Sequence, residues 1–326
     1  MKKILITGAS GFIGQSLIKS LLKLNKFVRG TIRSSNSFFS NTKIEYVTLG
    51  DINIKTSWKE NLVDVDCIIH CAGKVHEMKS SKNDLSKIYQ SVNVDGTIRL
   101  ANQAAEAKIR RLIFLSSIKV NGESTRNNHI NKFFNEKKKN VFTYKDIACP
   151  EDLYAKSKFE AEKALWKISS KTGLEVVVVR LPLVYGYGAK GNLARLIKLV
   201  KTGIPLPLGM IKNQRSMIGI DNLTDLLIRC IDHPEASGKT FLASDGEDLS
   251  TLELIKLIAS SMGKKANPFP LPIFLLKFLG SIFGKTEETN RLVGSLRIDN
   301  SFTKESLDWV PPISVKEGIR RMIQEK

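Results

Sequence analysis

The start of the chain constrains the fold most, because it joins an apolar strand, a glycine-rich turn and a helix. Lys2 to Thr7 (KKILIT) has the leucine and β-branched content of a buried parallel strand. It runs directly into GASGFIG at residues 8–14, and the next ten residues (QSLIKSLLKL) have a helical pattern. A strand, a tight turn and a helix in this order predict the first unit of an α/β fold.

Strand and helix patterns alternate as far as about Leu183. Such alternation predicts a parallel sheet with right-handed crossovers. The expected fold class is α/β, a Rossmann-type doubly wound parallel sheet with a smaller C-terminal substrate-binding lobe. Strands are expected near residues 3–7, 27–33, 44–49, 66–71, 111–116 and 175–180, and helices over 12–24, 86–107 and 152–172.

The composition changes after Pro182, where the chain becomes richer in glycine and proline. We therefore expect residues 1–182 to form a nucleotide-binding domain and residues 183–326 to form mainly a substrate-binding lobe. The apolar segment 240–243 (TFLA) is predicted to return as a strand to the main sheet, so that the lobes interleave. The polar, lysine-rich residues 123–150 are predicted to form a surface loop that borders the pocket.

The glycine-rich turn predicts a site for the phosphates of a dinucleotide. Gly8, Gly11 and Gly14 have the spacing GxxGxxG, which differs from the commonest GxGxxG fingerprint. Glycines let the backbone approach a pyrophosphate, and the free N–H groups of the following helix attract an anion. The turn therefore indicates a nucleotide cofactor between the first strand and the first helix.

Tyr154 and Lys158 are four residues apart on a predicted helix, so both side chains lie on the same face. At an effective dielectric near 20 and about 4 Å, an ammonium stabilises a phenolate by roughly 4 kcal/mol. We therefore expect Lys158 to lower the pKa of Tyr154 toward neutrality. A tyrosine of this kind can exchange a proton with an alcohol or ketone oxygen.

The apolar strand Arg111–Ser117 ends in Ser116 and Ser117. Ligands of open α/β sheets bind beyond the carboxyl ends of the strands, which is where a strand-terminal serine lies. Ser117 is therefore a candidate to hold a substrate oxygen. Together with Tyr154 and Lys158 it completes the set of candidate catalytic residues.

Several short motifs follow one another in a fixed order along the chain. They are TGASGFIG, Ile68–Gly73 (IIHCAG), Asn93–Thr97, Leu115–Ser117, Tyr154–Lys158, Arg180–Gly186 and Leu307–Pro311. The set resembles the extended short-chain dehydrogenase/reductases of the NAD-dependent epimerase/dehydratase family, over nearly the whole chain. Within that family it is most similar to two groups of bacterial surface-polysaccharide enzymes, the UDP-sugar 4-epimerases and the UDP-4-keto-6-deoxy-N-acetylhexosamine 4-reductases.

The resemblance implies a nicotinamide cofactor, NADP(H) or NAD(H). NAD-using relatives carry an acidic residue at the end of the second strand, where this chain has Ile32 followed by Arg33. A missing carboxylate beside a guanidinium favours a cofactor with a 2′-phosphate. The residues implied to bind the cofactor are Gly8, Gly11, Phe12, Ile13, Gly14, Arg33, Asp51, Ile52, Ala72, Gly73, Asn93, Tyr154 and Lys158.

The leading hypothesis is a ketoreductase that delivers hydride to C4 of a UDP-4-keto-6-deoxy-N-acetylhexosamine in O-antigen or capsule biosynthesis. Tyr154 would donate the proton to the C4 oxygen, Lys158 would also bind the nicotinamide ribose, and Ser117 would hydrogen-bond the same oxygen. The resemblance implies three further contacts to the nucleotide diphosphate of the substrate. These are Asn192, Arg215 and Arg291.

Three other functions are possible for a chain with these motifs. A redox-neutral UDP-glucose or UDP-N-acetylglucosamine 4-epimerase with tightly bound NAD uses the same catalytic residues, so these residues do not discriminate. A non-catalytic nucleotide sensor is disfavoured, because such relatives generally lose the tyrosine or the lysine. A dehydratase is excluded, because Ser117-Ile118-Lys119 lacks the acidic pair that dehydratases of the family carry there.

The net charge of +19 favours the binding of an anionic partner. The lysines are scattered along helices apart from one cluster at 132–139, and no nucleic-acid-binding signature accompanies them, so no nucleic acid partner is expected. A UDP-sugar or an anionic membrane surface explains the sign of the charge. Cys67, Cys71, Cys149 and Cys230 lack metal-type spacing, which predicts no bound metal and a reduced, cytoplasmic setting.

Residues 271–283 (LPIFLLKFLGSIF) are apolar except for Lys277. The segment is too short to span a bilayer, and no other apolar run reaches the length that spanning requires. They are predicted to form a helix that covers the substrate lobe. The alternative is a helix that lies on a membrane surface, which would make the association with the membrane peripheral. Family members commonly dimerise through the helices expected at 86–107 and 152–172, so a homodimer is expected.

Overall fold

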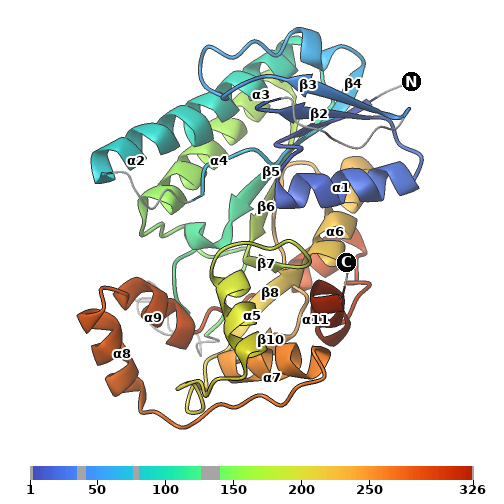
Figure 1. Ribbon diagram of the computed structural model, residues 1–326. Coiled ribbons are helices and arrows are strands. Elements are labelled where there is room, and N and C mark those ends of the chain that lie inside the picture. Colours follow the sequence, from blue (N-terminus) through green and yellow to red (C-terminus); the bar gives the residue numbers. More distant parts are fainter. Residues whose placement is uncertain (1–2, 35–41, 76–80, 126–139, 325–326) are drawn as a thin grey trace.

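The computed structural model describes residues 3–34, 42–75, 81–125 and 140–324 (Figure 1). Its main sheet has seven parallel strands in the order β3-β2-β1-β4-β5-β6-β9. This order is that of the doubly wound nucleotide-binding fold, so the predicted fold class is confirmed. The strands are β1 (Lys3–Thr7), β2 (Val28–Ile32), β3 (Ile44–Thr48), β4 (Val65–His70), β5 (Arg111–Ser117), β6 (Glu175–Leu181) and β9 (Lys239–Leu242).

Helices cover both faces of this sheet. Successive strand residues point to opposite faces, so Ile4 and Ile6 of β1 pack with α1 and α6 while Leu5 packs with α3 and α4. The predicted helix at 86–107 is a continuous run that includes a π-helical stretch at Gln90–Asp95. The helices of this domain are α1 (Phe12–Lys23), α2 (Lys82–Tyr89), α3 (Gly96–Glu106), α4 (Leu153–Thr172) and α6 (Ile220–Asp232).

A second, three-stranded sheet in the order β10-β8-β7 forms the centre of the smaller lobe. Its strands are β7 (Leu183–Tyr185), β8 (Arg215–Gly219) and β10 (Asp248–Leu249). Four helices, α5, α7, α9 and α11, bury apolar residues in a common cluster with it, and α8 packs against α9 at the edge of this lobe (Figure 1). The helices are α5 (Asn192–Thr202), α7 (Thr251–Ser261), α8 (Ile273–Ile282), α9 (Thr286–Val293), α10 (Ser301–Leu307) and α11 (Val315–Gln324).

The chain returns to the main sheet after it has entered the second lobe. β9 lies parallel beside β6, with Thr240 opposite Val178, where the segment 240–243 was expected to form a strand. The loop predicted at 123–150 is described only outside 126–139, and the lysine cluster at 132–139 lies outside the described residues. On either side of that gap the backbone is bonded to the segment after α9: Thr125 donates to the Ser295 carbonyl at 3.0 Å.

The sheet brings together the strand ends that carry the predicted site. Thr7 at the end of β1 lies opposite His70 at the end of β4, and His70 lies opposite Phe114 in β5. Ser117 closes β5 two residues beyond Leu115. The candidate residues after these strands therefore meet at one edge of the sheet, next to the first turn of α4.

Candidate active site

The glycine-rich turn forms a cradle that has no room for side chains. Gly8 has φ +67°, and a Cβ on Gly14 would come within 2.4 Å of the Gly8 carbonyl oxygen. Gly11 is the N-cap of α1, where no side chain caps the helix and the first turn carries no acid. The first amides of α1 are thus left for an external anion, and the cradle fits the pyrophosphate of a dinucleotide.

The loop after β4 closes against this turn. A Cβ on Gly8 would come within 2.9 Å of the Ala72 Cα, so the two backbones touch. A Cβ on Gly73 would lie 3.2 Å from the Asn93 Oδ1 and 3.3 Å from the Lys158 Nζ. The structure therefore brings the predicted cofactor residue Gly8 against Ala72, and Gly73 close to Asn93 and the candidate catalytic lysine.

Asn93 fixes that loop to α4. Its Oδ1 accepts a hydrogen bond from the Lys74 amide at 2.8 Å, and its Nδ2 donates to the Lys74 carbonyl at 3.0 Å. The same Nδ2 donates to the Ser157 hydroxyl at 3.0 Å. Asn93 is buried. Its contacts within the protein therefore hold the edge of the cofactor site in place.

His70 joins the strand ends through a directed chain of hydrogen bonds that sequence reasoning missed. Thr7 Oγ1 accepts from the Ala72 amide at 3.1 Å and lies 2.7 Å from the His70 Nδ1. Thr97 Oγ1 donates to the Asn93 carbonyl and lies 2.9 Å from the His70 Nε2. Burial lowers the pKa of His70 to about 3, so the ring is neutral, with its proton on Nε2 to suit both threonines. The available signal was a histidine closing an apolar strand.

The three candidate catalytic side chains converge at the end of β5 and the start of α4. Asp152 caps α4 by accepting from the Ala155 amide at 2.6 Å, which places Tyr154 in the first turn. The Tyr154 and Ser117 side chains share a hydrogen bond. Lys158 is buried one turn further on the same face. The predicted grouping of these residues thus forms.

The expected effect of Lys158 on Tyr154 is not met. Burial raises the pKa of Tyr154, and the hydrogen bond with Ser117 only partly opposes it. Burial also lowers the pKa of Lys158 to about 8. The Lys158 ammonium donates to the Leu115 carbonyl at 2.9 Å, so it serves the strand end as well as the site. Desolvation therefore outweighs the charge pairing that spacing alone suggested.

A buried ion pair lies behind the catalytic residues. Arg180 Nη2 contacts Glu162 Oε2 at 2.6 Å, and Ser116 donates a short hydrogen bond to the same carboxylate. Arg180 also donates to Asn121 Oδ1 at 2.9 Å. Because Glu162 belongs to α4 and Ser116 to β5, the pair locks the catalytic helix to the catalytic strand. Ser116 therefore has a structural contact, and the Ser117 hydroxyl accepts from the Lys119 amide at 3.3 Å.

Lys119 occupies the stretch after β5 where an acidic pair would indicate a dehydratase. Its Nζ contacts Glu123 Oε1 at 2.6 Å and Asp152 Oδ2 at 2.5 Å. The two acids hold the lysine beside the first turn of α4. Asp152 is at the same time the cap of that helix. The segment after Ser117 thus carries a paired cation.

Two of the predicted substrate contacts lie together, and one is apart from them. Arg215 donates to the Arg291 carbonyl at 2.8 Å, and the Arg291 charge, after burial, helps to lower the pKa of Arg215. Arg291 pairs with Glu287 at 3.3 Å, and its Nε has no hydrogen-bond partner among the described residues. Two adjacent guanidinium groups favour an anion. Asn192 is exposed at the first turn of α5.

The remaining cofactor candidates lie at the far strand ends. Arg33 is exposed just after β2. Asp51 is exposed after β3, and a Cβ on Gly96 would come within 2.7 Å of the Ile52 side chain. Ile52 also packs against the cluster between the sheet and α3. Ile52 is therefore held in place, while Arg33 and Asp51 face solvent.

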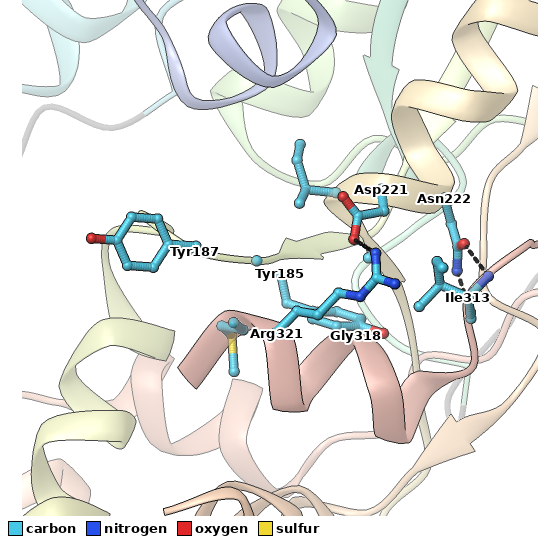
Figure 2. Close-up of a pocket in the computed structure, with 11 residues that line it drawn as sticks. Tyr185, Tyr187, Asp221, Asn222, Ile313, Gly318 and Arg321 are labelled. Carbon is cyan, nitrogen blue, oxygen red and sulfur yellow. Dashed lines mark hydrogen bonds and ion pairs between the residues drawn. The ribbon is translucent and has the colours of Figure 1, made fainter. Parts of the chain in front are cut away.

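A further pocket lies between β7, α6 and α11 and does not include the candidate catalytic residues (Figure 2). Arg321 of α11 faces Asp221 of α6 there, at 3.1 Å (Figure 2). A Cβ on Gly186, which lines this pocket, would lie 3.4 Å from the ring of Phe12 at the start of α1. The Phe12 side chain therefore approaches the second lobe beside this pocket.

Comparison with known families decides the relationship. The model of the NAD dependent epimerase/dehydratase family matches residues 4–243. The chain belongs to this family. The predicted membership is confirmed. The protein is an NAD-dependent enzyme, and its cofactor is a nicotinamide dinucleotide, whose pyrophosphate fits the glycine cradle. Among the described residues the four cysteines are free thiols, and no described helix is long and apolar enough to cross a membrane.

Two relatives align with nearly the whole of this chain. A UDP-glucose 4-epimerase from Vibrio cholerae is 41% identical over 325 residues, covering 99% of this chain and 95% of the relative. An N-acetyl-α-D-glucosaminyl-diphospho-ditrans,octacis-undecaprenol 4-epimerase from Escherichia coli O157:H7 is 23% identical over 340 residues, covering 98% and 94%. Both relatives align along the two lobes.

Solved structures share the fold of this epimerase/dehydratase family member. A UDP-N-acetylglucosamine 4-epimerase from Bacillus cereus has a TM-score of 0.77 at 20% identity, covering 99% of this chain and 98% of that one. A UDP-glucuronic acid 4-epimerase from the same species, in complex with NAD, has a TM-score of 0.75 at 20% identity and 99% coverage of both. At this identity the similarity supports the fold alone.

Proposed function

We propose that this protein is an NAD-dependent UDP-sugar 4-epimerase. The observation that carries the proposal is the 41% identity, over nearly both full lengths, to a relative named UDP-glucose 4-epimerase. The convergence of Ser117, Tyr154 and Lys158 beside the glycine cradle supports it. The epimerase, which the sequence leaves open as the alternative, thus replaces the 4-ketoreductase as the leading hypothesis.

The chemistry follows from the positions of these side chains. The bound nicotinamide supplies the hydride acceptor and donor. Tyr154 removes the proton from the C4 hydroxyl and returns it to the C4 oxygen after the sugar has presented its other face, so no net oxidation occurs. Ser117 hydrogen-bonds the same oxygen, and the Lys158 ammonium binds the nicotinamide ribose. Acid–base help of this kind contributes about 10²–10⁴ in rate.

The adjacent guanidinium groups of Arg215 and Arg291 support a diphosphate site. Their mutual repulsion contributes to the lowered pKa of Arg215, which an anion between them would relieve. The Glu123 carboxylate, which interacts with Arg215, is also bonded to Lys119. We infer that the UDP diphosphate lies at Arg215 and Arg291, and we retain Asn192 as an expected contact.

The reductase is kept as the second candidate because of one observation. β2 ends at Ile32 without a carboxylate, and the exposed Arg33 follows. Such an end suits a 2′-phosphate, and NADPH is the usual reductant of a ketoreductase. The Arg33→Asp variant tests this reading, since it weakens NADP binding strongly and leaves or improves NAD binding if Arg33 contacts the phosphate.

Turnover by the protein alone distinguishes the two candidates. The purified enzyme is incubated with UDP-glucose or UDP-N-acetylglucosamine without added cofactor, and the nucleotide it carries is identified after denaturation. An epimerase carries NAD and forms the C4 epimer of the supplied sugar, while Tyr154→Phe forms none. If product appears only with NADPH and a 4-keto sugar, the reductase assignment replaces the epimerase.

We further propose that the enzyme works in the cytoplasm as a homodimer through α3 and α4. Free thiols and a nucleotide-sugar substrate support the location. The dimer rests on kinship with the family, and light scattering after size exclusion tests it. A monomeric mass across micromolar concentrations would exclude this interface.

A further inference from the structure

Helix α8 and the residue after it expose an unusual amount of aromatic surface. The exposed fractions are 74% for Phe274, 60% for Phe278, 61% for Ile282 and 71% for Phe283. Within the described residues, every phenylalanine that is more than half exposed lies in this segment. Soluble monomers rarely gather large apolar side chains in this way unless the patch binds something.

The inner face of α8 already has its packing partners. Ile273 and Leu276 pack against the apolar cluster of the second lobe. Gly280 is buried, and a Cβ there would come within 2.2 Å of the Thr289 hydroxyl of α9. Only the inner face of α8 thus covers the substrate lobe, as the sequence predicted for this helix.

The outer face is apolar as well. Phe274, Phe278 and Ile282 are spaced i, i+4 and i+8, so they form one stripe along the helix. This stripe lies on the side away from Ile273 and Leu276. A helix that is apolar on both faces needs a second apolar environment. The fold provides that environment for the inner face alone.

Residues 254–286, which include α8, contain lysines and no aspartate or glutamate. The next acids, Glu287 and Glu288, lie in the first turn of α9, which packs against α8. Lys277 is three residues from Phe274, so it flanks the stripe. The lysines of this segment are Lys256, Lys264, Lys265, Lys277 and Lys285. Exposed aromatics among lysines match the interface of an anionic lipid layer.

We propose that α8 docks the enzyme on an anionic lipid surface. Phe274, Phe278, Ile282 and Phe283 enter the boundary between headgroups and acyl chains, and the lysines remain at the level of the lipid phosphates. α8 lies at the outer edge of the second lobe, so docking there leaves the main sheet in water (Figure 1). The inference does not depend on which sugar the enzyme converts.

A second copy of the chain is a poorer occupant. An isologous contact brings the same patch of both subunits together, so the lysine-bearing stripe would face itself. The segment offers no acid of its own to neutralise those lysines. Like charges in a buried contact are costly. An anionic lipid surface satisfies the aromatic side chains and the lysines at once.

Vesicle co-sedimentation of the intact enzyme tests the proposal. We expect binding to phosphatidylcholine vesicles that contain phosphatidylglycerol, and much weaker binding to phosphatidylcholine alone or at high salt. The double variant Phe274→Ser/Phe278→Ser lowers the partition coefficient by about tenfold or more. The matched control is Ile54→Ser/Val310→Ser, which changes two exposed side chains outside this segment and binds like the wild type.

A second pair of variants tests the charge. Lys265→Gln/Lys277→Gln/Lys285→Gln lowers binding by about fivefold per lysine, while Lys23→Gln/Lys55→Gln/Lys316→Gln, of equal charge, has a smaller effect. Thermal unfolding confirms that each variant is folded. Absence of binding to the anionic vesicles, or equal binding by the phenylalanine double variant, overturns the proposal. Loss of a dimer in that variant, without vesicle binding, assigns the patch to a second copy instead.

Discussion

At the scale of single residues, the Tyr154 hydroxyl carries the proposed proton transfer. It shares a hydrogen bond with Ser117, which opposes the rise in the pKa of Tyr154 that burial causes. Replacing Tyr154 by Phe removes the proton and leaves the ring. We expect kcat to fall by about 10²–10⁴, with cofactor binding and thermal stability close to the wild type. Tyr144→Phe, whose ring stacks on Phe302 of α10, is the control. Equal kcat values for both variants would reject the role of Tyr154.

His70 makes a prediction about pH. The folded protein keeps His70 neutral, because burial lowers its pKa to about 3, whereas the unfolded chain has an ordinary histidine pKa near ~6.5. Between these values the unfolded state binds the additional proton, so stability falls as the pH falls through this window. From about pH 7.5 to about pH 5.5 the wild type should lose about 1 kcal/mol more than His70→Gln. Urea unfolding at both pH values measures this, and equal losses would show that His70 titrates normally when folded.

At the scale of elements, the turn between β1 and α1 depends on the absence of a side chain at Gly14. A Cβ there would lie 2.4 Å from the Gly8 carbonyl oxygen and 3.0 Å from the Ala9 Cα, and backbone atoms cannot yield cheaply. Gly14→Ala should therefore lower stability by about 1–3 kcal/mol and weaken dinucleotide binding. Lys23→Ala, exposed in the last turn of the same helix, should leave both unchanged. Calorimetric titration with NAD measures the binding, and normal affinity in Gly14→Ala would contradict the cradle.

Most strands of the main sheet could be predicted from the sequence, whereas contacts between distant elements could not. The central strands β1, β4, β5 and β6 were predictable because each is an apolar run rich in leucine or β-branched residues, and β9 because TFLA is such a run. The hydrogen bond between His70 and Thr97 and the ion pair between Glu162 and Arg180 were not predictable. Contacts between distant segments leave no periodic pattern in the sequence. The exposure of Phe274 was missed for a related reason. An apolar run indicates burial, and only the packed fold shows which face of a helix stays uncovered.

At the scale of the whole molecule, one carboxylate joins the two lobes. Asp245 follows β9 of the main sheet, and its side chain accepts from the Tyr185 hydroxyl of β7 at 2.7 Å. It also accepts from the Gly219 amide at the end of β8 at 3.0 Å and from the Asn222 Nδ2 of α6 at 2.7 Å. Burial raises the pKa of Asp245 in spite of these bonds. The relative position of the lobes thus depends on a few polar contacts as well as on apolar packing.

Removing that carboxylate should loosen the lobes together with the site between them. In Asp245→Ala the donors from Tyr185, Gly219 and Asn222 lose their common acceptor, which should lower the free energy of unfolding by about 3 kcal/mol. Tyr185→Phe removes only one of the bonds and should cost about 1 kcal/mol, while Glu305→Ala on the exposed side of α10 should change stability by less than about 0.5 kcal/mol. Urea unfolding followed by tryptophan fluorescence measures all three. An Asp245→Ala midpoint equal to that of Glu305→Ala would mean that apolar packing alone holds the lobes together.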